Sequence, residues 1–428
     1  MPRRHFWLAA ALTALLVPLP ARAQSSCTTL GQNTFVRDTL DSYYYWYKEL
    51  PRLDPGLYTS PEAYLDAVRY RPLDSSFSYI SGRAASDAFY SDSQFIGFGF
   101  ATRLESDSEL RVAQVFADSP ASEAGLERGV RIRTIDGRTI AELVASGQIN
   151  SAFGLSEIGV SVTISFDDLA GASRSATMVK RLVTIPTVSL TRTLDVDGRR
   201  VAYVHFRNFV QPSFPALDAA FAQLQQEGAT ELVLDLRYNG GGLVSVAQRL
   251  ASLIGGSRSY AQTFCQFFHN DKQSARNQTL LFENPPLALN LQRLVVLTTR
   301  SSASASELVI NALRPFIPVI VVGDRTYGKP VGQYSFNFCD KVLYPVAFTL
   351  LNARGEGNFF DGFAPDCAAA DDLDHLLGDP AEASLGAAIG FIRTGACQVA
   401  AAARPRTSAA ELARLRALDG FQQLVGAH

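Results

Sequence analysis

The spacing of apolar residues predicts a helical beginning for the chain. Within residues 28–93, Val36, Leu40 and Tyr44 recur every fourth position, and a second helix is predicted from Pro61 to Val68. An amphipathic helix packs its aromatic side chains on the body of the protein, so we interpret the aromatic cluster around Tyr44 as packing residues rather than as a ligand cage. We therefore expect a small N-terminal helical segment over residues 28–93.

The pattern then changes to alternation. From residue 95 to 183, apolar and polar residues alternate, as in Leu110–Val115 and Val160–Ile164, and glycines separate the runs. Such alternation predicts β-strands and hence a small β-rich domain. From residue 184 to 397, apolar strands follow helical stretches in turn, which is typical of βα units. The predicted fold class is an α/β core of βα units around a mixed sheet, with a β-rich domain and an N-terminal helical segment.

The last segment, residues 398–428, is less informative. It carries a run of alanines, Pro405 and a short predicted helix from Ser408 to Leu418, with Ser408 as its N-cap. We expect a peripheral C-terminal tail.

The first 23 residues have the pattern of an export signal. Arg3 and Arg4 precede an apolar run from Phe6 to Leu19, and residues 21–23 form an Ala-Arg-Ala cleavage site. The run is shorter than the roughly 20 residues that a membrane span needs, so a membrane anchor is the less favoured interpretation. We expect residues 1–23 to be removed and the mature protein to be exported to the periplasm or secreted, with no stable membrane span.

Composition and charge exclude several function classes. The chain has 428 residues, of which 47% are hydrophobic and 19% charged, so it is not disordered and has room for two or three packed domains. Its 39 basic and 41 acidic residues give a formal net charge of −2, which leaves no overall positive field for a phosphate backbone or an anionic membrane. Nucleic acid is therefore not an expected partner.

The cysteines indicate an oxidising compartment. Five cysteines follow the predicted signal, so at least one is unpaired. Cys265 and Cys339 each lie in a short aromatic stretch, and we expect them to form a disulfide. Cys27 has Gln24 three residues before it, where a lipid-attachment signal has leucine, so anchoring as a lipoprotein is disfavoured. The spacing of cysteines and histidines predicts no metal site.

Two turns that follow apolar strands carry candidate chemistry. Asp235–Gly242 ends in three consecutive glycines, whose backbone amides can converge on an oxyanion. The spacing of phosphate-binding glycine motifs is absent, and a flexible turn is the alternative. Ser301–Glu307 precedes the predicted helix Leu308–Leu313, whose N-terminus favours a serine nucleophile. Alternatively, Ser306 is only the N-cap of that helix.

A third segment supplies a candidate base. Lys329 lies in a loop flanked by glycine and proline after the strand that ends at Val322. Because burial disfavours a charged ammonium, Lys329 can act as a neutral base, whereas a surface lysine is the alternative. Of the histidines beyond the signal, only His269 has a suitable setting for pairing with a serine. A Ser-Lys dyad fits the remaining residues better.

Together, these segments resemble the carboxyl-terminal processing peptidases, also called tail-specific proteases, a family of exported serine peptidases with an inserted PDZ domain. The resemblance implies that Ser304, in the turn S-A-S-A-S-E, is the nucleophile. It implies that Lys329, 25 residues later, is the base and that Gln333 orients this lysine. No metal or organic cofactor is implied.

The resemblance also implies two sites made of backbone amides. The oxyanion hole is expected to consist of Gly241, Gly242 and Ala305. The β-rich segment resembles a PDZ domain, with matching residues at 118–126 and 135–137. Its carboxylate-binding loop, expected to bind the substrate's tail, is Ile96, Gly97, Phe98, Gly99 and Phe100.

The function implied is that of an exported serine endopeptidase, which cleaves polypeptides that it recognises through apolar C-terminal tails. Three residues depart from the family pattern: Pro330 follows the lysine in place of glycine, Val130 replaces an aspartate, and Asp324 stands where glutamate is common. The first two departures motivate an alternative, a catalytically inactive PDZ-type scaffold protein that only binds tails.

Overall fold

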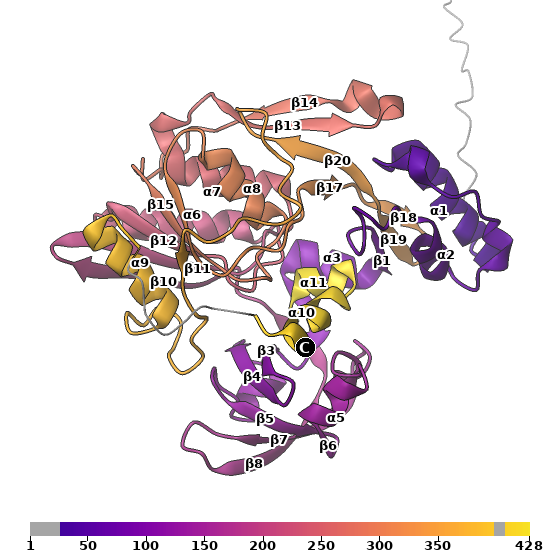
Figure 1. The fold of residues 1–428 in the computed structure, drawn as a ribbon, viewed down its shortest axis with the longest axis horizontal. Coiled ribbons are helices and arrows are strands. Elements are labelled where there is room, and N and C mark those ends of the chain that lie inside the picture. The colour runs from indigo at the N-terminus through magenta and orange to yellow at the C-terminus, as the bar shows by residue number, and fades with distance from the viewer. Residues whose placement is uncertain (1–25, 398–406) are drawn as a thin grey trace, which may run out of the picture.

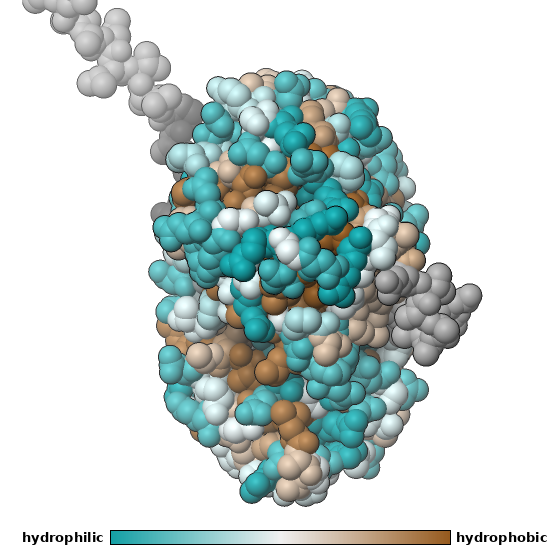
Figure 2. Space-filling view, turned by 90° about the vertical axis from the view of Figure 1, so that its left-hand side faces the viewer, coloured by the Kyte–Doolittle hydropathy of each residue, from teal (hydrophilic) through white to brown (hydrophobic). Residues whose placement is uncertain are grey.

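The computed structural model describes residues 26–397 and 407–428, and three regions surround the C-terminal helices (Figure 1). The predicted export signal and the alanine-rich start of the predicted tail lie outside the described residues. Within these ranges, no helix combines the length and apolar character needed to cross a membrane. The face seen in Figure 2 carries small apolar groups scattered among polar side chains.

The core is built around a six-stranded sheet, which confirms the predicted α/β class. Its first two strands are antiparallel and the other neighbours are parallel, so the sheet is mixed. In spatial order the strands are β10 (Val188–Val196), β11 (Arg199–Phe206), β12 (Glu231–Asp235), β15 (Leu294–Thr298), β16 (Val319–Gly323) and β21 (Cys367–Ala368).

Helices cover both faces of this sheet, because successive strand residues point to opposite sides. Val204 and Phe206 of β11 join the apolar cluster beneath three helices, whereas Tyr203 packs on the opposite face against a fourth. The first three helices are α6 (Ser213–Gln226), α7 (Val244–Gly255) and α8 (Ala305–Leu313), and the fourth is α9 (Ala383–Thr394).

A second, antiparallel sheet arches over α7 and α8 in Figure 1. Phe267 and Phe348 from this sheet enter the same apolar cluster as the helices. Its strands, in spatial order, are β14 (Gln278–Leu281), β13 (Thr263–His269), β20 (Val346–Leu351) and β17 (Val331–Gln333). Because β17 begins directly after Lys329 and Pro330, this sheet fixes the lysine loop close to α8. The short helices η4 (Gly256–Arg258) and η5 (Asp271–Arg276) flank β13.

The N-terminal region is helical where the pattern predicts it. Val36, Leu40 and Tyr44 are almost completely buried in one apolar cluster. The region also contributes a strand that pairs with the core, in the order β1-β19-β18. Its elements are α1 (Thr29–Tyr43), η1 (Tyr47–Glu49), η2 (Pro55–Leu57), α2 (Pro61–Val68), β1 (Tyr79–Gly82) and α3 (Arg83–Asp92), and the core strands are β18 (Phe336–Phe338) and β19 (Lys341–Tyr344).

A β module is inserted between the N-terminal region and the core. Strand β2 (Gln94–Gly97) enters it and pairs with β9 (Arg181–Thr184), which leaves it. Its sheet has the order β3-β4-β5-β7-β8, with β6 paired to β5, around its own apolar cluster. The elements are β3 (Phe100–Ser106), β4 (Glu109–Val115), α4 (Pro120–Glu123), β5 (Arg131–Ile135), β6 (Arg138–Thr139), α5 (Ile140–Ala145), η3 (Ser151–Phe153), β7 (Ser161–Asp167) and β8 (Ser173–Val179).

The prediction of a peripheral tail is wrong for residues 407–428. Two helices, α10 (Ala409–Arg416) and α11 (Gly420–Val425), lie between the β module and the rest of the protein (Figure 1). Leu424 and Val425 are 7% and 5% exposed, in a cluster with residues of α3 and β9. Leu412, Leu415, Leu418, Phe421 and Leu424 recur every third residue in the tail, but this pattern does not show which surface they pack against.

The predicted disulfide between Cys265 and Cys339 is also wrong. Cys339 pairs with Cys27, and Cys367 pairs with Cys397. Cys265 is a free thiol, fully buried in the core, because its side chain points inward from β13. The Cys27–Cys339 disulfide ties the start of α1 to the turn between β18 and β19.

Removing the Cys27–Cys339 disulfide is expected to destabilise the protein, because it closes a loop with a sequence separation of 312 residues. The double substitution Cys27→Ser and Cys339→Ser should lower the free energy of unfolding by about 2–4 kcal/mol. Chemical denaturation followed by fluorescence measures this loss. The difference between the variant and the unchanged chain should vanish in excess reductant; equal stability without reductant would contradict the pairing.

Candidate active site

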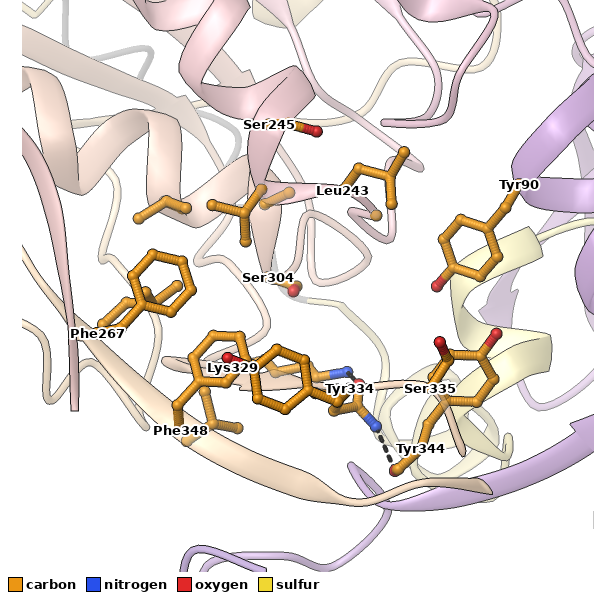
Figure 3. A pocket seen from close by; sticks show the side chains of 18 of the residues that line it. Tyr90, Leu243, Ser245, Phe267, Ser304, Lys329, Tyr334, Ser335, Tyr344 and Phe348 are labelled. Carbon is orange, nitrogen blue, oxygen red and sulfur yellow. Dashed lines mark hydrogen bonds between the residues drawn. The ribbon is translucent and has the colours of Figure 1, made fainter. Parts of the chain in front are cut away.

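The predicted catalytic residues meet in one cavity of about 520 Å³. It lies between the glycine turn after β12, the start of α8 and the lysine loop before β17, and α3 closes one side. The residues of the predicted set that line it are Ser304, Ala305, Lys329, Gln333 and Gly242. Figure 3 shows Ser304 and Lys329 facing this space. The fold thus brings together residues that are distant in the sequence.

Of the serines at positions 301, 302, 304 and 306, Ser304 is the one that lines the cavity. The hydroxyls of Ser302 and Ser306 are buried and donate to the carbonyl oxygens of Leu236 and Asn239, at 2.7 and 3.0 Å. Ser304 is the N-cap of α8, in place of Ser306, and its φ of 56° lies in the left-handed region. A non-glycine residue in such a conformation costs on the order of 1–3 kcal/mol, so packing must hold this turn in place.

Two backbone amides beside Ser304 are free to bind an oxyanion. Among the hydrogen bonds of the described residues, none uses the amides of Gly242 or Ala305. The Gly241 amide, which we predicted as a third donor, is already donated to Asn239 Oδ1 at 2.9 Å. Gly241 has a different importance: a Cβ on it would lie 2.8 Å from Ser304 Cβ, so only glycine lets the two turns approach this closely.

Gln333 holds the amine of Lys329. Lys329 Nζ donates to Gln333 Oε1 at 2.7 Å. The Gln333 amide nitrogen donates to the carbonyl oxygens of Phe77 and Tyr344, at 2.7 Å each, which turns its oxygen toward the lysine. In this part of the described chain, Lys329 Nζ and Ser304 Oγ form no direct hydrogen bond. Catalytic hydrogen bonds are often absent from unliganded sites and form when substrate binds.

The environment of Lys329 favours its neutral form. Burial lowers its pKa from 10.5 to about 8, although the charges of Asp74 and Glu307 act in the opposite direction. The amine also lies 5.8 Å from the centre of the Phe77 ring. At pH 7, a lysine with this pKa is neutral in about a tenth of the molecules, against less than a thousandth for an ordinary lysine.

Glu307 joins the serine turn to the lysine loop. Its fully buried carboxylate accepts hydrogen bonds from the Ser304 amide at 2.9 Å, the Thr326 hydroxyl at 2.6 Å, and the amides of Gly328 and Lys329 at 2.7 and 2.8 Å. Burial raises the pKa of Glu307 to about 7, although these hydrogen bonds counteract that shift. Sequence analysis quoted Glu307 as part of its motif but gave it no role.

A network of buried ion pairs fixes the segment that leads into the glycine turn. The Arg237 guanidinium is completely buried and pairs with Asp235, Asp371 and Glu382 at 2.6, 3.0 and 2.9 Å. Arg128 of the β module reaches the same network, donating to the Tyr238 hydroxyl at 2.8 Å. The turn that precedes Gly241 is therefore fixed on both sides. In the sequence, the one sign of this network is Arg237, which lies three residues before the first glycine of the turn.

His269, the alternative base, is engaged elsewhere. Its ring nitrogens contact Asn277 Oδ1 and the Tyr334 hydroxyl, at 3.0 and 2.9 Å. The ring stacks on Tyr334, with 5.8 Å between the ring centres. This geometry gives His269 no contact with Ser304. In the ranges that the structure describes, no group of three or more potential ligands could hold a metal ion.

The predicted carboxylate-binding loop runs from the end of β2 to the start of β3. The amides of Phe98, Gly99 and Phe100 all point at one atom, the carbonyl oxygen of His428, at 2.9, 2.8 and 3.4 Å. Ile96 lines a neighbouring cavity of about 90 Å³ that also borders His428. Gly97 lies so close to this residue that a Cβ would be 2.8 Å from the His428 carbonyl carbon. The five predicted residues therefore lie together around His428.

Comparison with known families is consistent with this geometry. The model described as peptidase family S41 matches residues 200–369, and that of the peptidase S41 N-terminal domain matches residues 31–79. The chain belongs to peptidase family S41. Members of this family are serine-type peptidases, so the resemblance to carboxyl-terminal processing peptidases is confirmed.

Several curated relatives of this S41 protein match about half of it. The chloroplastic C-terminal processing peptidase of Tetradesmus obliquus is 27% identical over 230 residues, 52% of this chain and 48% of the relative. The carboxyl-terminal-processing protease of Picosynechococcus sp. is 29% identical over 252 residues, 56% of each chain. The chain thus spans about half the length of the curated relatives it matches.

Solved structures resemble the S41 protein over more of its length. A protein of Bacteroides fragilis assigned to the S41 proteases superimposes with a TM-score of 0.69 at 27% identity, covering 84% of this chain and 97% of the other. The photosystem II D1 C-terminal processing protease gives a TM-score of 0.50 at 21% identity, covering 81% and 94%, which indicates a shared fold.

Proposed function

We propose that this protein is an exported serine endopeptidase that uses Ser304 as nucleophile and Lys329 as general base. One observation carries the proposal: a strained, available serine at a helix N-terminus shares a cavity with a lysine whose pKa is lowered to about 8. Neutral lysine can accept the serine proton as the hydroxyl attacks.

The reaction follows from the positions of these groups. The Ser304 oxygen attacks the carbonyl carbon of the scissile peptide while its proton passes to Lys329 Nζ. The amides of Gly242 and Ala305 stabilise the oxyanion, each by roughly 3 kcal/mol. The lysine ammonium then protonates the departing amine, which leaves an acyl-enzyme on Ser304. Water, deprotonated by the lysine, hydrolyses the ester and restores both residues.

The cavity supports a preference for an apolar side chain next to the scissile bond. Phe267 and Phe348 lie on one side of Ser304 in Figure 3. Leu308 also lines the cavity, and all three residues belong to the core cluster. An apolar substrate side chain placed there would leave water for an apolar surface, which stabilises the complex. The tyrosines Tyr90 and Tyr344 line the opposite side.

We assign tail recognition to the β module, as a PDZ-like domain. Its loop of three converging amides is suited to a carboxylate, and the neighbouring edge of β3 is suited to an added strand. In this proposal the N-terminal helical segment spans residues 28–93, the PDZ-like domain residues 95–183 and the peptidase core residues 184–397. Export is supported by the two disulfides, which persist in oxidising compartments.

A pair of substrates tests this function. An unfolded protein with an apolar tail is incubated with the purified chain, once with a free terminal carboxylate and once amidated, and the products are identified by mass spectrometry. We expect cleavage of both, faster for the free tail. The scaffold alternative, motivated by Pro330 and Val130, predicts that the free tail binds and that both substrates stay intact.

Replacing Gln333 with glutamate should move the pH profile. A carboxylate beside Lys329 Nζ favours the ammonium, so its pKa rises, and the pH at which kcat/KM reaches half its plateau should increase by about 1–3 units. The control Gln333→Met adds no charge and should lower kcat/KM without this displacement. An unshifted profile in Gln333→Glu would show that Lys329 is not the titrating base.

A further inference from the structure

The carboxylate-binding loop is filled by the protein's own tail. Besides the three amides that bind the His428 carbonyl oxygen, the His428 amide donates to the Phe100 carbonyl oxygen at 2.8 Å. This reciprocal pair with β3 is the pattern of a strand added to a sheet edge. A residue of this chain thus makes the backbone contacts that a substrate tail would make.

The His428 side chain also has a fitted site. Its ring stacks on Phe153, with ring centres 4.0 Å apart and an angle of 29° between the planes. Its Nε2 lies 2.9 Å from the Thr102 hydroxyl. Both partners belong to the β module, from η3 and β3. The groove therefore contacts this side chain through an aromatic face and a hydroxyl.

Three further backbone groups along this edge of β3 are occupied by α10 and the residue that caps it. The Thr102 carbonyl oxygen accepts from Arg414, the Leu104 amide donates to Glu411 and the Leu104 carbonyl oxygen accepts from Ser408, at 3.2, 3.2 and 2.9 Å. Arg414 and Glu411 are buried and paired at 2.6 Å. A peptide cannot add to this edge while the tail stays in place.

The same tail segment touches the back of the catalytic turn. The buried Arg207 guanidinium donates to the carbonyl oxygens of Val425 and Gly426, at 2.9 Å each, and also to that of Tyr238. A Cβ on Gly240 would lie only 2.5 Å from the Gln423 carbonyl oxygen. One segment, residues 420–428, therefore joins the binding loop to the turn that carries Gly242.

We propose that residues 426–428 are an intramolecular ligand of the PDZ-like groove, which competes with substrate tails for the Phe98–Phe100 amides. This inference rests on the proposed function of the β module in tail binding. Residues 426–428 must therefore leave the groove before a substrate tail can bind there. Peptides that place a flat ring with a hydrogen-bonding nitrogen at the position of the His428 ring should compete best, because the groove already accommodates that side chain.

A binding experiment without catalysis tests the proposal. The probe is a fluorescein-labelled peptide with the sequence of residues 420–428, and fluorescence anisotropy measures its Kd for chains that carry Ser304→Ala. We expect deletion of residues 426–428 to tighten binding at least about tenfold, since it frees the loop. His428→Ala in the full chain should give an intermediate Kd. His375→Ala, whose partly exposed ring pairs with Asp372 and does not contact the groove, should leave the Kd unchanged.

His428→Ala keeps the full chain, so it gives a result even if the chain without residues 426–428 misfolds. Circular dichroism checks the fold of every variant. Equal Kd values for the full chain, the deletion and His428→Ala would overturn the proposal. So would a failure of every variant to bind the peptide. Because no cleavage is measured, a chain that lacked peptidase activity would still give these binding results, so the two proposals fail separately.

Discussion

Replacing Ser304 with alanine is expected to abolish peptidase activity. The substitution removes the atom that forms the acyl-enzyme, so kcat/KM for an unfolded protein substrate should fall on the order of 10⁴-fold or more, as in other serine peptidases. The fold should be retained, because no hydrogen bond of the described residues uses the Ser304 hydroxyl as donor. Peptide release followed by quantitative mass spectrometry measures the loss.

Ser301→Ala provides the matched control for this prediction. Ser301 lies in the same turn, but its hydroxyl donates to no group among the described residues and it does not line the catalytic cavity. Its substitution should leave kcat/KM unchanged. Activity that survives in Ser304→Ala, or that disappears in Ser301→Ala, would mean that another hydroxyl of this turn is the nucleophile.

Replacing Lys329 with methionine is the second change with a large expected effect. Methionine keeps the apolar stem but removes the proton acceptor, so kcat/KM should fall by about 10²–10⁴-fold at every pH. Lys329→Arg should be equally inactive, because a guanidinium stays protonated. Stability should not fall with activity, since Lys329→Met also removes an amine that is costly to bury when charged.

The pH dependence of kcat/KM in the unchanged chain is the reference for these variants. Burial lowers the pKa of Lys329 to about 8, so the active, neutral form accumulates as the pH rises through 8. kcat/KM should increase about tenfold per unit below this pH and level off above it. Retained activity in Lys329→Met would instead favour a different base, such as His269.

The sequence predicted what depends on local pattern. The mixed sheet follows from apolar strands that alternate with helical stretches, and the buried face of α1 follows from Val36, Leu40 and Tyr44. Ser304 and Lys329 could be grouped because each lies six residues after the end of a strand, β15 and β16. Parallel strands place their carboxyl ends along one edge of the sheet, where such side chains meet. The role of Gln333, the last residue of β17, was implied only by the family resemblance.

What the sequence did not reveal depends on long-range packing. Cys27 and Cys339 are adjacent only because α1 packs on β18, and no local pattern distinguishes Cys339 from Cys265 as the paired residue. The buried tail was missed because its contacts are mostly backbone and charged groups, such as Glu411 with Leu104. Glu307 was visible in its motif, but its role as a link between two loops appears only in three dimensions.

Covalent labelling tests the central claim most directly, since it reports on the serine and the lysine together. A fluorophosphonate reacts only with an activated serine hydroxyl, and mass spectrometry of the digested protein locates the adduct. We predict one adduct, on Ser304, at a rate that rises with pH to a plateau with a midpoint near 8, and no adduct in Lys329→Met. An adduct elsewhere, no adduct at any pH, or equal labelling of Lys329→Met would contradict the account.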